Sequence, residues 1–111
     1  MSNILNLKAA GRTWSINTSN LPSGFVDEDE NTQFLLASNF LAKQLCLSRN
    51  RFTFAELTFL STVVGVTFSE IADACGLTIK EAKFWEKRFP VSKKHSALMI
   101  PFFLKRLSSN D

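Results

Sequence analysis

The strongest chemical signal in this 111-residue chain is positive charge concentrated toward its C-terminal end. Of thirteen Lys and Arg residues, eight lie between Lys80 and Arg106, where the only two acidic residues are glutamates. Basic groups gathered over so short a segment can contact phosphate oxygens, although a solvent-exposed helix face has the same composition. Residues 1–50, by contrast, balance four basic side chains against the acidic run 27–30.

Residue types that support catalysis or metal binding are few and scattered. His95, the only histidine, is flanked by Lys94 and Ser96, with no sign of a nucleophile or an orienting carboxylate nearby, so we interpret it as a surface residue. Cys46 and Cys75 form neither a zinc-binding spacing nor a disulfide framework, and they fit a reducing cytoplasm. Glycine-rich phosphate loops and paired catalytic carboxylates are also missing. We therefore expect no enzyme, no metal and no other cofactor.

The elements that position the basic side chains are marked by a repeated pattern, Thr-x-x-Glu, which begins at Thr53, Thr67 and Thr78. In such a capping box the Thr hydroxyl and the Glu carboxylate each accept a backbone N–H that the helix itself leaves unpaired. Gly65 and Gly76 suit the left-handed conformation that ends a helix. These signals predict helices over 53–64, 68–75 and 79–88.

Weaker patterns mark the remaining elements. Apolar residues at three- and four-residue steps predict a helix from Gln33 to about Cys46, and Ser92 can cap a last helix over 93–107. Pro101 would have to kink or restart that last helix. Two partly alternating segments, 3–9 and 12–17, predict a β-hairpin turning at Ala10-Gly11.

Together these elements predict a mainly α protein. We expect a hairpin with an acidic linker over residues 1–32 and a compact domain of four or five helices over 33–108. Apolar residues make up 45% of the chain, which is ample for a packed core. The longest apolar run, 97–104, contains Pro101 and is too short to cross a membrane.

Residues 68–88 carry the pattern of a helix-turn-helix, in which two short helices are joined by a tight turn. Apolar side chains recur on the faces that must meet, and charged side chains recur on the opposite faces. The predicted inward positions are Ile71, Ala72, Cys75, Leu77, Ala82 and Trp85; the predicted outward positions are Glu70, Asp73, Lys80, Lys83 and Lys87.

The stretch GVTFSEIADACGLTIKEAKFWE, from Gly65 to Glu86, resembles the Cro/repressor-type (XRE) helix-turn-helix, whose domain is lambda-repressor-like. Over most of the chain, the order of a small strand-containing module, a linking helix and this helix-turn-helix domain is also similar to antitoxins of the MqsA type. Their zinc-binding cysteine pairs are absent, so no metal is carried over. The positions that match the XRE pattern are Gly65, Thr67, Glu70, Ile71, Ala72, Gly76, Leu77, Thr78, Trp85 and Glu86.

This resemblance implies a regulator of transcription, a repressor or an antitoxin-like autoregulator, that places the helix after Thr78 in the major groove of double-stranded DNA. A homodimer on a palindromic operator is expected, because one short helix makes few specific contacts. The DNA-contacting residues would be Phe68, Ser69, Thr78, Ile79, Lys80, Lys83, Phe84, Lys87 and Arg88.

Several residues at the expected DNA-contacting positions differ from those usual in the family. Phe68 stands where the family usually has a glutamine, and no Asn, Gln or Arg is available for bidentate base contacts before Arg88. Lysines can contact phosphates or guanine, and Ile79 or Phe84 can touch thymine methyl groups. Packing against another helix or a partner subunit is the alternative for Phe68 and Phe84.

Two other functions fit part of the sequence. Phe68, Ile79 and Phe84 could form an apolar docking patch for a toxin or another protein, on the same helix-turn-helix scaffold. Stacking of phenylalanine rings on single-stranded nucleic acid is a second alternative. The absence of tyrosine and the helical spacing of the phenylalanines count against stacking.

Overall fold

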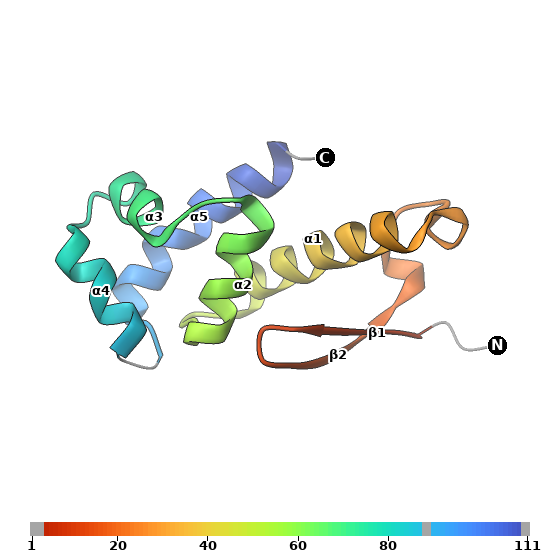
Figure 1. The fold of residues 1–111 in the computed structure, drawn as a ribbon, viewed down its shortest axis with the longest axis horizontal. Coiled ribbons are helices and arrows are strands. Elements are labelled where there is room, and N and C mark those ends of the chain that lie inside the picture. Colours follow the sequence, from red (N-terminus) through yellow and green to blue (C-terminus); the bar gives the residue numbers. More distant parts are fainter. Residues whose placement is uncertain (1–3, 88–89, 110–111) are drawn as a thin grey trace.

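The elements run from a hairpin to a cluster of helices (Figure 1). The computed structural model describes residues 4–87 and 90–109. Within them, the predicted mainly α fold of four or five helices with a small N-terminal hairpin is confirmed, and the α-helices number five. Strands β1 (Ile4–Ala9) and β2 (Arg12–Asn17) lead through the 3-10 helices η1 (Thr18–Asn20) and η2 (Phe25–Asp27) to α1 (Glu30–Ser48), α2 (Phe54–Val64), α3 (Phe68–Ala74), α4 (Ile79–Lys87) and α5 (Lys93–Ser109).

Hydrogen bonds at three helix starts match the three Thr-x-x-Glu sequences. In α2, the Thr53 hydroxyl accepts the N–H of Glu56 at 3.1 Å, and the Glu56 carboxylate accepts the N–H of Thr53 at 2.9 Å. Each such pair satisfies two backbone donors, so short helices can begin close together. The same reciprocal bonds join Thr67 with Glu70 and Thr78 with Glu81.

Glycines in the left-handed conformation end α2 and α3, as predicted. Gly65 has φ 71° and Gly76 has φ 72°. After Gly76 the chain turns back at once, because the N–H of Leu77 donates to the carbonyl of Ala72 at 2.7 Å. This bond is a helix-ending contact of the Schellman kind, and it sets the tight turn between α3 and α4.

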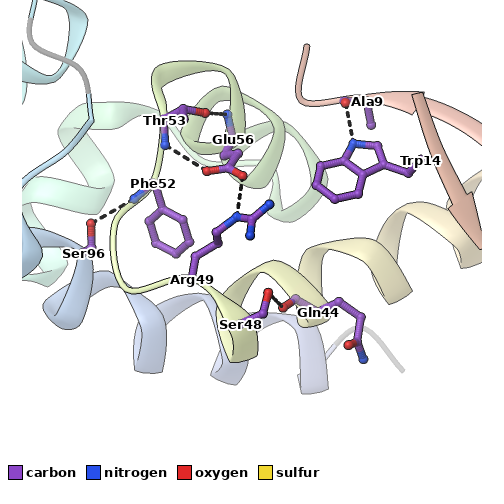
Figure 2. A network of polar contacts seen from close by, with 9 residues as sticks. All are labelled: Ala9, Trp14, Gln44, Ser48, Arg49, Phe52, Thr53, Glu56 and Ser96. Atoms are coloured by element: carbon purple, nitrogen blue, oxygen red, sulfur yellow. Dashed lines mark hydrogen bonds and ion pairs between the residues drawn. The ribbon is translucent and has the colours of Figure 1, made fainter. Parts of the chain in front are cut away.

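The hairpin has the predicted strands and turn. β1 and β2 pair antiparallel from Ile4↔Asn17 to Ala9↔Arg12, and both turn residues, Ala10 and Gly11, have positive φ. That combination matches the twist of the strands, as in type I′ turns. The Trp14 indole N–H donates to the Ala9 carbonyl at 2.7 Å beside this turn (Figure 2).

The hairpin packs onto α1 and shares a core with it. Leu7 and Ile16 lie in one buried cluster with Leu41 and Leu45 of α1. The helix starts at Glu30, capped by the Asp29 carboxylate on the N–H of Thr32, so the predicted boundary between residues 32 and 33 falls inside its first turn. The cap residue, an aspartate, is a common helix start that the apolar periodicity alone does not show.

A second, larger cluster occupies the other end of the molecule. It joins residues of every α-helix and includes Leu57, Ile71, Trp85 and Phe103. The two clusters lie on different sides of α1, since Leu41 and Leu45 belong to one and Ala42 and Cys46 to the other. The molecule is elongated, with extents of 48 × 25 × 20 Å (Figure 1).

In the described ranges, no single helix is long and apolar enough to cross a membrane. α2 and α3 have the necessary length and apolar composition only when taken together, and they are bent by 86° where they meet.

Polar contacts around the buried carboxylate of Glu56 hold the connection between α1 and α2 (Figure 2). One carboxylate oxygen caps α2 through Thr53, and the other accepts the Arg49 Nε–H at 2.9 Å. The backbone N–H of Phe52, the residue before Thr53, donates to the Ser96 hydroxyl of α5 at 3.2 Å. The junction therefore ties the end of α1, the start of α2 and the first turns of α5 together.

The last helix does not restart at its proline. α5 is one helix from Lys93 to Ser109, with Pro101 inside it. A proline has no N–H, so the carbonyl of Ala97, four residues earlier, lacks its helical donor. Both residues are exposed, and water can hydrogen-bond that carbonyl instead.

Candidate nucleic-acid interface

The outward face of α4 combines lysines with large apolar side chains. Lys80 and Lys83 are exposed, and Ile79 and Phe84 are 61% and 56% exposed. At 3.6 residues per turn these four positions fall within an arc of roughly 140° on one side of the helix. Ile79 and Phe84 lie at the two edges of that arc, and both lysines lie between them. This arrangement presents two cationic groups along the middle of an exposed surface.

The opposite face of α4 is fixed in the core. Ala82 and Trp85 are 4% and 2% exposed, and they share a cluster with Ile71 and Ala72 of α3. Ala72 is 1% exposed, so its side chain is enclosed by this cluster. The predicted inward and outward faces are thus confirmed at these positions, and packing determines which side of α4 meets solvent.

His95 is not the isolated surface residue that the sequence indicated. Its Nδ1 accepts the indole N–H of Trp85 at 3.0 Å, and its Nε2 lies 3.4 Å from Glu81 Oε2. Since a ring nitrogen that accepts cannot carry a proton, the neutral ring has its proton on Nε2, toward the carboxylate. The histidine therefore links the first turn of α5 to two successive turns of α4.

Glu81 contacts both this histidine and Thr78, the residue that caps α4. Hydrogen bonds from the Thr78 N–H and hydroxyl, at 3.0 and 3.1 Å, lower the pKa of the Glu81 carboxyl below its ordinary value, and His95 adds to this shift. The carboxylate is therefore ionised at neutral pH and engaged by its neighbours. Its place in the structure is that of a helix cap and interhelical contact.

Phe68 is drawn into the interior. Its ring is partly buried, with centroids 5.9 Å from both Phe54 and Trp85 in edge-to-face geometry. Such aromatic pairs stabilise a core beyond the area they bury. Of the two interpretations that the sequence allowed for Phe68, the structure shows packing within the chain, so we omit its ring from the surface that can reach a ligand.

The other predicted contact residues divide into three groups. Ser69 is exposed at the start of α3. Thr78 is exposed too, but its hydroxyl is shared with Glu81, from whose N–H it accepts at 3.2 Å. The side chain of Lys87 and the whole of Arg88 lie outside the described residues.

Arg51 is a basic residue that the sequence did not single out. Its guanidinium donates to the carbonyls of Pro90 and Val91 at 3.2 and 3.1 Å. These bonds cross about forty positions of the chain, so no local pattern reveals them. They tie the connection that follows α4 to the connection that precedes α2.

The described residues offer little to support another kind of site. Groups of three His, Cys, Asp or Glu side chains that could hold a metal ion are not found among them. Burial raises the pKa of the Cys46 thiol to about 12 and also raises that of Cys75, so neither sulfur has the character of an activated thiolate.

Comparisons of the chain with protein-family models, with curated proteins and with solved structures gave no significant match. The resemblance to XRE proteins therefore stays a prediction that rests on the residues between Gly65 and Glu86.

Proposed function

We propose that this protein binds double-stranded DNA with the outward face of α4 in the major groove and regulates transcription. The observation that carries the proposal is the position of Lys80 and Lys83 in the middle of the only face of α4 that its described side chains leave open to solvent. The rest of the helix is fixed by Trp85 and by the glycine-containing turn before it. A short, fixed helix with a cationic outer face suits a polyanionic groove.

The chemistry of this face supports limited sequence recognition by each copy. Lysine ammonium groups can contact phosphates or the O6 and N7 atoms of guanine, and Ile79 and Phe84 offer apolar contact to thymine methyl groups. α4 has nine residues, so it spans about 13 Å and meets only a few base pairs. We infer that two copies act together on a palindromic operator whose half-sites lie about 34 Å apart.

Autoregulation as a repressor or an antitoxin-like protein remains a narrower hypothesis. It comes from the sequence resemblance alone, and it would add a protein partner to the DNA ligand.

A protein-docking role for the same face is the second candidate, and Phe84 and Ile79 favour it by their exposure. Two facts weigh against it. Phe68 is engaged inside the chain. The remaining two apolar side chains are separated by the lysines rather than joined into one patch. Stacking on single-stranded nucleic acid is weaker still, because only Phe84 offers an open ring on the described part of this face.

A gel-shift assay of the protein with DNA from upstream of its own coding sequence, repeated over a range of salt concentrations, tests the proposal. Lys83→Ala should weaken binding substantially and reduce the slope of log affinity against log salt by roughly one if the side chain meets a phosphate. If it contacts guanine, the loss should be about 1–3 kcal/mol and confined to the cognate sequence.

Lys8→Ala is the matched control, because this lysine is exposed on the distant hairpin. The proposal fails if Lys80→Ala/Lys83→Ala binds cognate and random DNA as tightly as wild type does.

A further inference from the structure

One face of α1 is apolar beyond the point where α5 covers it. Leu35, Ser38, Ala42 and Cys46 recur at three- and four-residue steps and so lie along one side of the helix. Ala42 and Cys46 are buried in the cluster that contains Phe103 of α5. α5 runs antiparallel to α1 and ends before the N-terminal turns of α1 are reached (Figure 1).

The uncovered turns expose large apolar side chains. Phe34 is 55% exposed and Leu35 is 62% exposed, whereas Ser38, one turn further, is buried and its hydroxyl has no hydrogen-bond partner among the described residues. Val26, in η2 beside the start of α1, is also exposed. We call Val26, Phe34 and Leu35 the α1 patch. Leu35 continues the stripe that α5 already uses for packing, and Phe34 lies beside this stripe, one turn before Ser38.

Negative charge borders the α1 patch. Asp27, Glu28, Asp29 and Glu30 are all exposed and lie in sequence between Val26 and Phe34. Residues 13–42 contain these four carboxylates and no Lys or Arg. Hydrogen bonds from the backbone and side chain of Thr32 lower the pKa of Asp29, so this carboxyl is ionised under ordinary conditions. A ligand of this surface must bring apolar groups together with positive charge.

We propose that the α1 patch binds an amphipathic basic helix of another protein, which packs on α1 in continuation of α5. Helix-on-helix packing is the contact for which the stripe is already spaced, and Lys or Arg beside the partner's apolar face would meet the acidic run. Three apolar side chains make a small contact surface, so we expect a weak, reversible contact rather than a permanent complex.

A second copy of this chain fits the α1 patch less well. In a twofold contact the same patch meets itself, which would bring the two acidic runs together. Contact between the α1 patch and the basic α4 of a second copy would bring opposite charges together, but it joins two different surfaces. Such a contact forms open chains of copies unless the rotation between successive copies closes a ring.

The experiment uses the full chain and a synthetic helical peptide of about 18 residues with Leu on one face and Lys on the other. A peptide of the same composition, with its leucines scattered around the helix, controls for charge attraction alone. Binding is measured by fluorescence anisotropy of the labelled peptide. We expect the amphipathic peptide to bind at least about tenfold more tightly than the scattered one.

Two double variants locate the binding. Phe34→Ser/Leu35→Ser should weaken the amphipathic peptide by about tenfold or more. Ile79→Ser/Phe84→Ser removes nearly the same exposed side chains from α4 and should leave peptide binding unchanged. Circular dichroism checks that both variants keep the wild-type helix content.

Several results would overturn the proposal. Equal binding of both peptides would mean that charge alone attracts them. Equal binding by wild type and Phe34→Ser/Leu35→Ser, or loss of binding only in the α4 variant, would move the site elsewhere. Light scattering that shows a wild-type dimer, abolished by Phe34→Ser/Leu35→Ser, would assign the α1 patch to a second copy instead.

Discussion

The two ends of the molecule expose similar apolar side chains in opposite electrostatic surroundings. At one end, Ile79 and Phe84 flank the lysines of α4; at the other, Phe34 and Leu35 follow the acidic run before α1. We call these the basic end and the acidic end. Because the exposed fractions are nearly equal, hydrophobicity cannot distinguish the ligands of the two ends. The charges do so, and they favour a polyanion at one end and a basic protein at the other.

Reversal of charge tests this distinction with the largest expected effect. Lys80→Glu/Lys83→Glu should lower affinity for DNA by about 100-fold or more, because two attractive charges become repulsive toward the phosphates. Asp27→Lys/Glu28→Lys at the acidic end should change the same affinity by less than about threefold, since the added charges lie far from the groove. Anisotropy titrations with labelled duplex DNA measure both. Equal losses, or none, would show that the two ends do not differ as ligand surfaces for DNA.

The basic end also depends on close packing behind its exposed face. Ala72→Leu should overpack the crossing of α3 and α4 and lower the free energy of unfolding by about 1–3 kcal/mol. Ala74→Leu makes the same change at an exposed position of the same helix, so its effect should stay within about 0.5 kcal/mol. Urea unfolding followed by circular dichroism measures the two. If Ala72→Leu melts like wild type, Ala72 does not lie at a helix contact.

The link between α4 and α5 gives a third, smaller effect. His95→Ala leaves the indole N–H of Trp85 without its acceptor and should cost about 1–2 kcal/mol in the free energy of unfolding. Trp85→Phe removes the same bond from the other side, so the double variant should lose less than the two single losses added together. Strict additivity in a double-mutant cycle would argue against the bond.

The smallest effect concerns acid stability, and both ends take part in it. Glu81 and Asp29 accept hydrogen bonds at the starts of α4 and α1, and the pKa of each carboxyl is lowered on folding. Each ionised carboxylate therefore stabilises the fold fully above its unfolded pKa, about 4 for such groups, and this stabilisation is lost as pH falls through the folded value. Glu81→Gln and Asp29→Asn should each flatten the fall of Tm between about pH 5 and 3.

His95 distinguishes the two carboxylates. Because its ring lies beside Glu81 alone, His95→Gln should diminish the effect of Glu81→Gln and leave that of Asp29→Asn unchanged. A fall in Tm that is the same in all variants would contradict the assignment of these two groups.

Much of the fold follows from local signals in the sequence. Each capping box closes within four residues, and Gly65, Gly76 and the Ala10-Gly11 turn need only their own backbone conformation. Such signals do not depend on what lies elsewhere in the chain, so they predicted the hairpin strands and the start or end of α2, α3 and α4.

What the sequence did not predict depends on contacts between distant elements. The bond from Trp85 to His95 forms only because the connection after α4 brings the first turn of α5 beside Trp85. Neighbours in sequence made His95 look like a surface residue. The sequence likewise predicted the hairpin as a segment separate from the helical domain. The contacts of Leu7 and Ile16 with α1 join parts of the chain that are distant in sequence, so local patterns do not show them.

The sequence predicted one part of the candidate site, the outward face of α4, but not the position of Phe68. Helical periodicity correctly separated Lys80 and Lys83 from Ala82 and Trp85. Periodicity could not predict whether the ring of Phe68, at the start of α3, packs inside the chain or faces a ligand. The rings that it contacts, Phe54 and Trp85, come from two other helices.

Pro101 gives α5 two halves with separate duties. The half before it contacts α4 through His95 and the connection between α1 and α2 through Ser96. The half after it packs in the core along α1 through Phe103 and Leu107. The missing amide at Pro101 interrupts the ladder of backbone bonds at the boundary between these halves. In hydrogen exchange the helix should therefore open as two units, with the amides near the basic end freed while those along α1 remain protected.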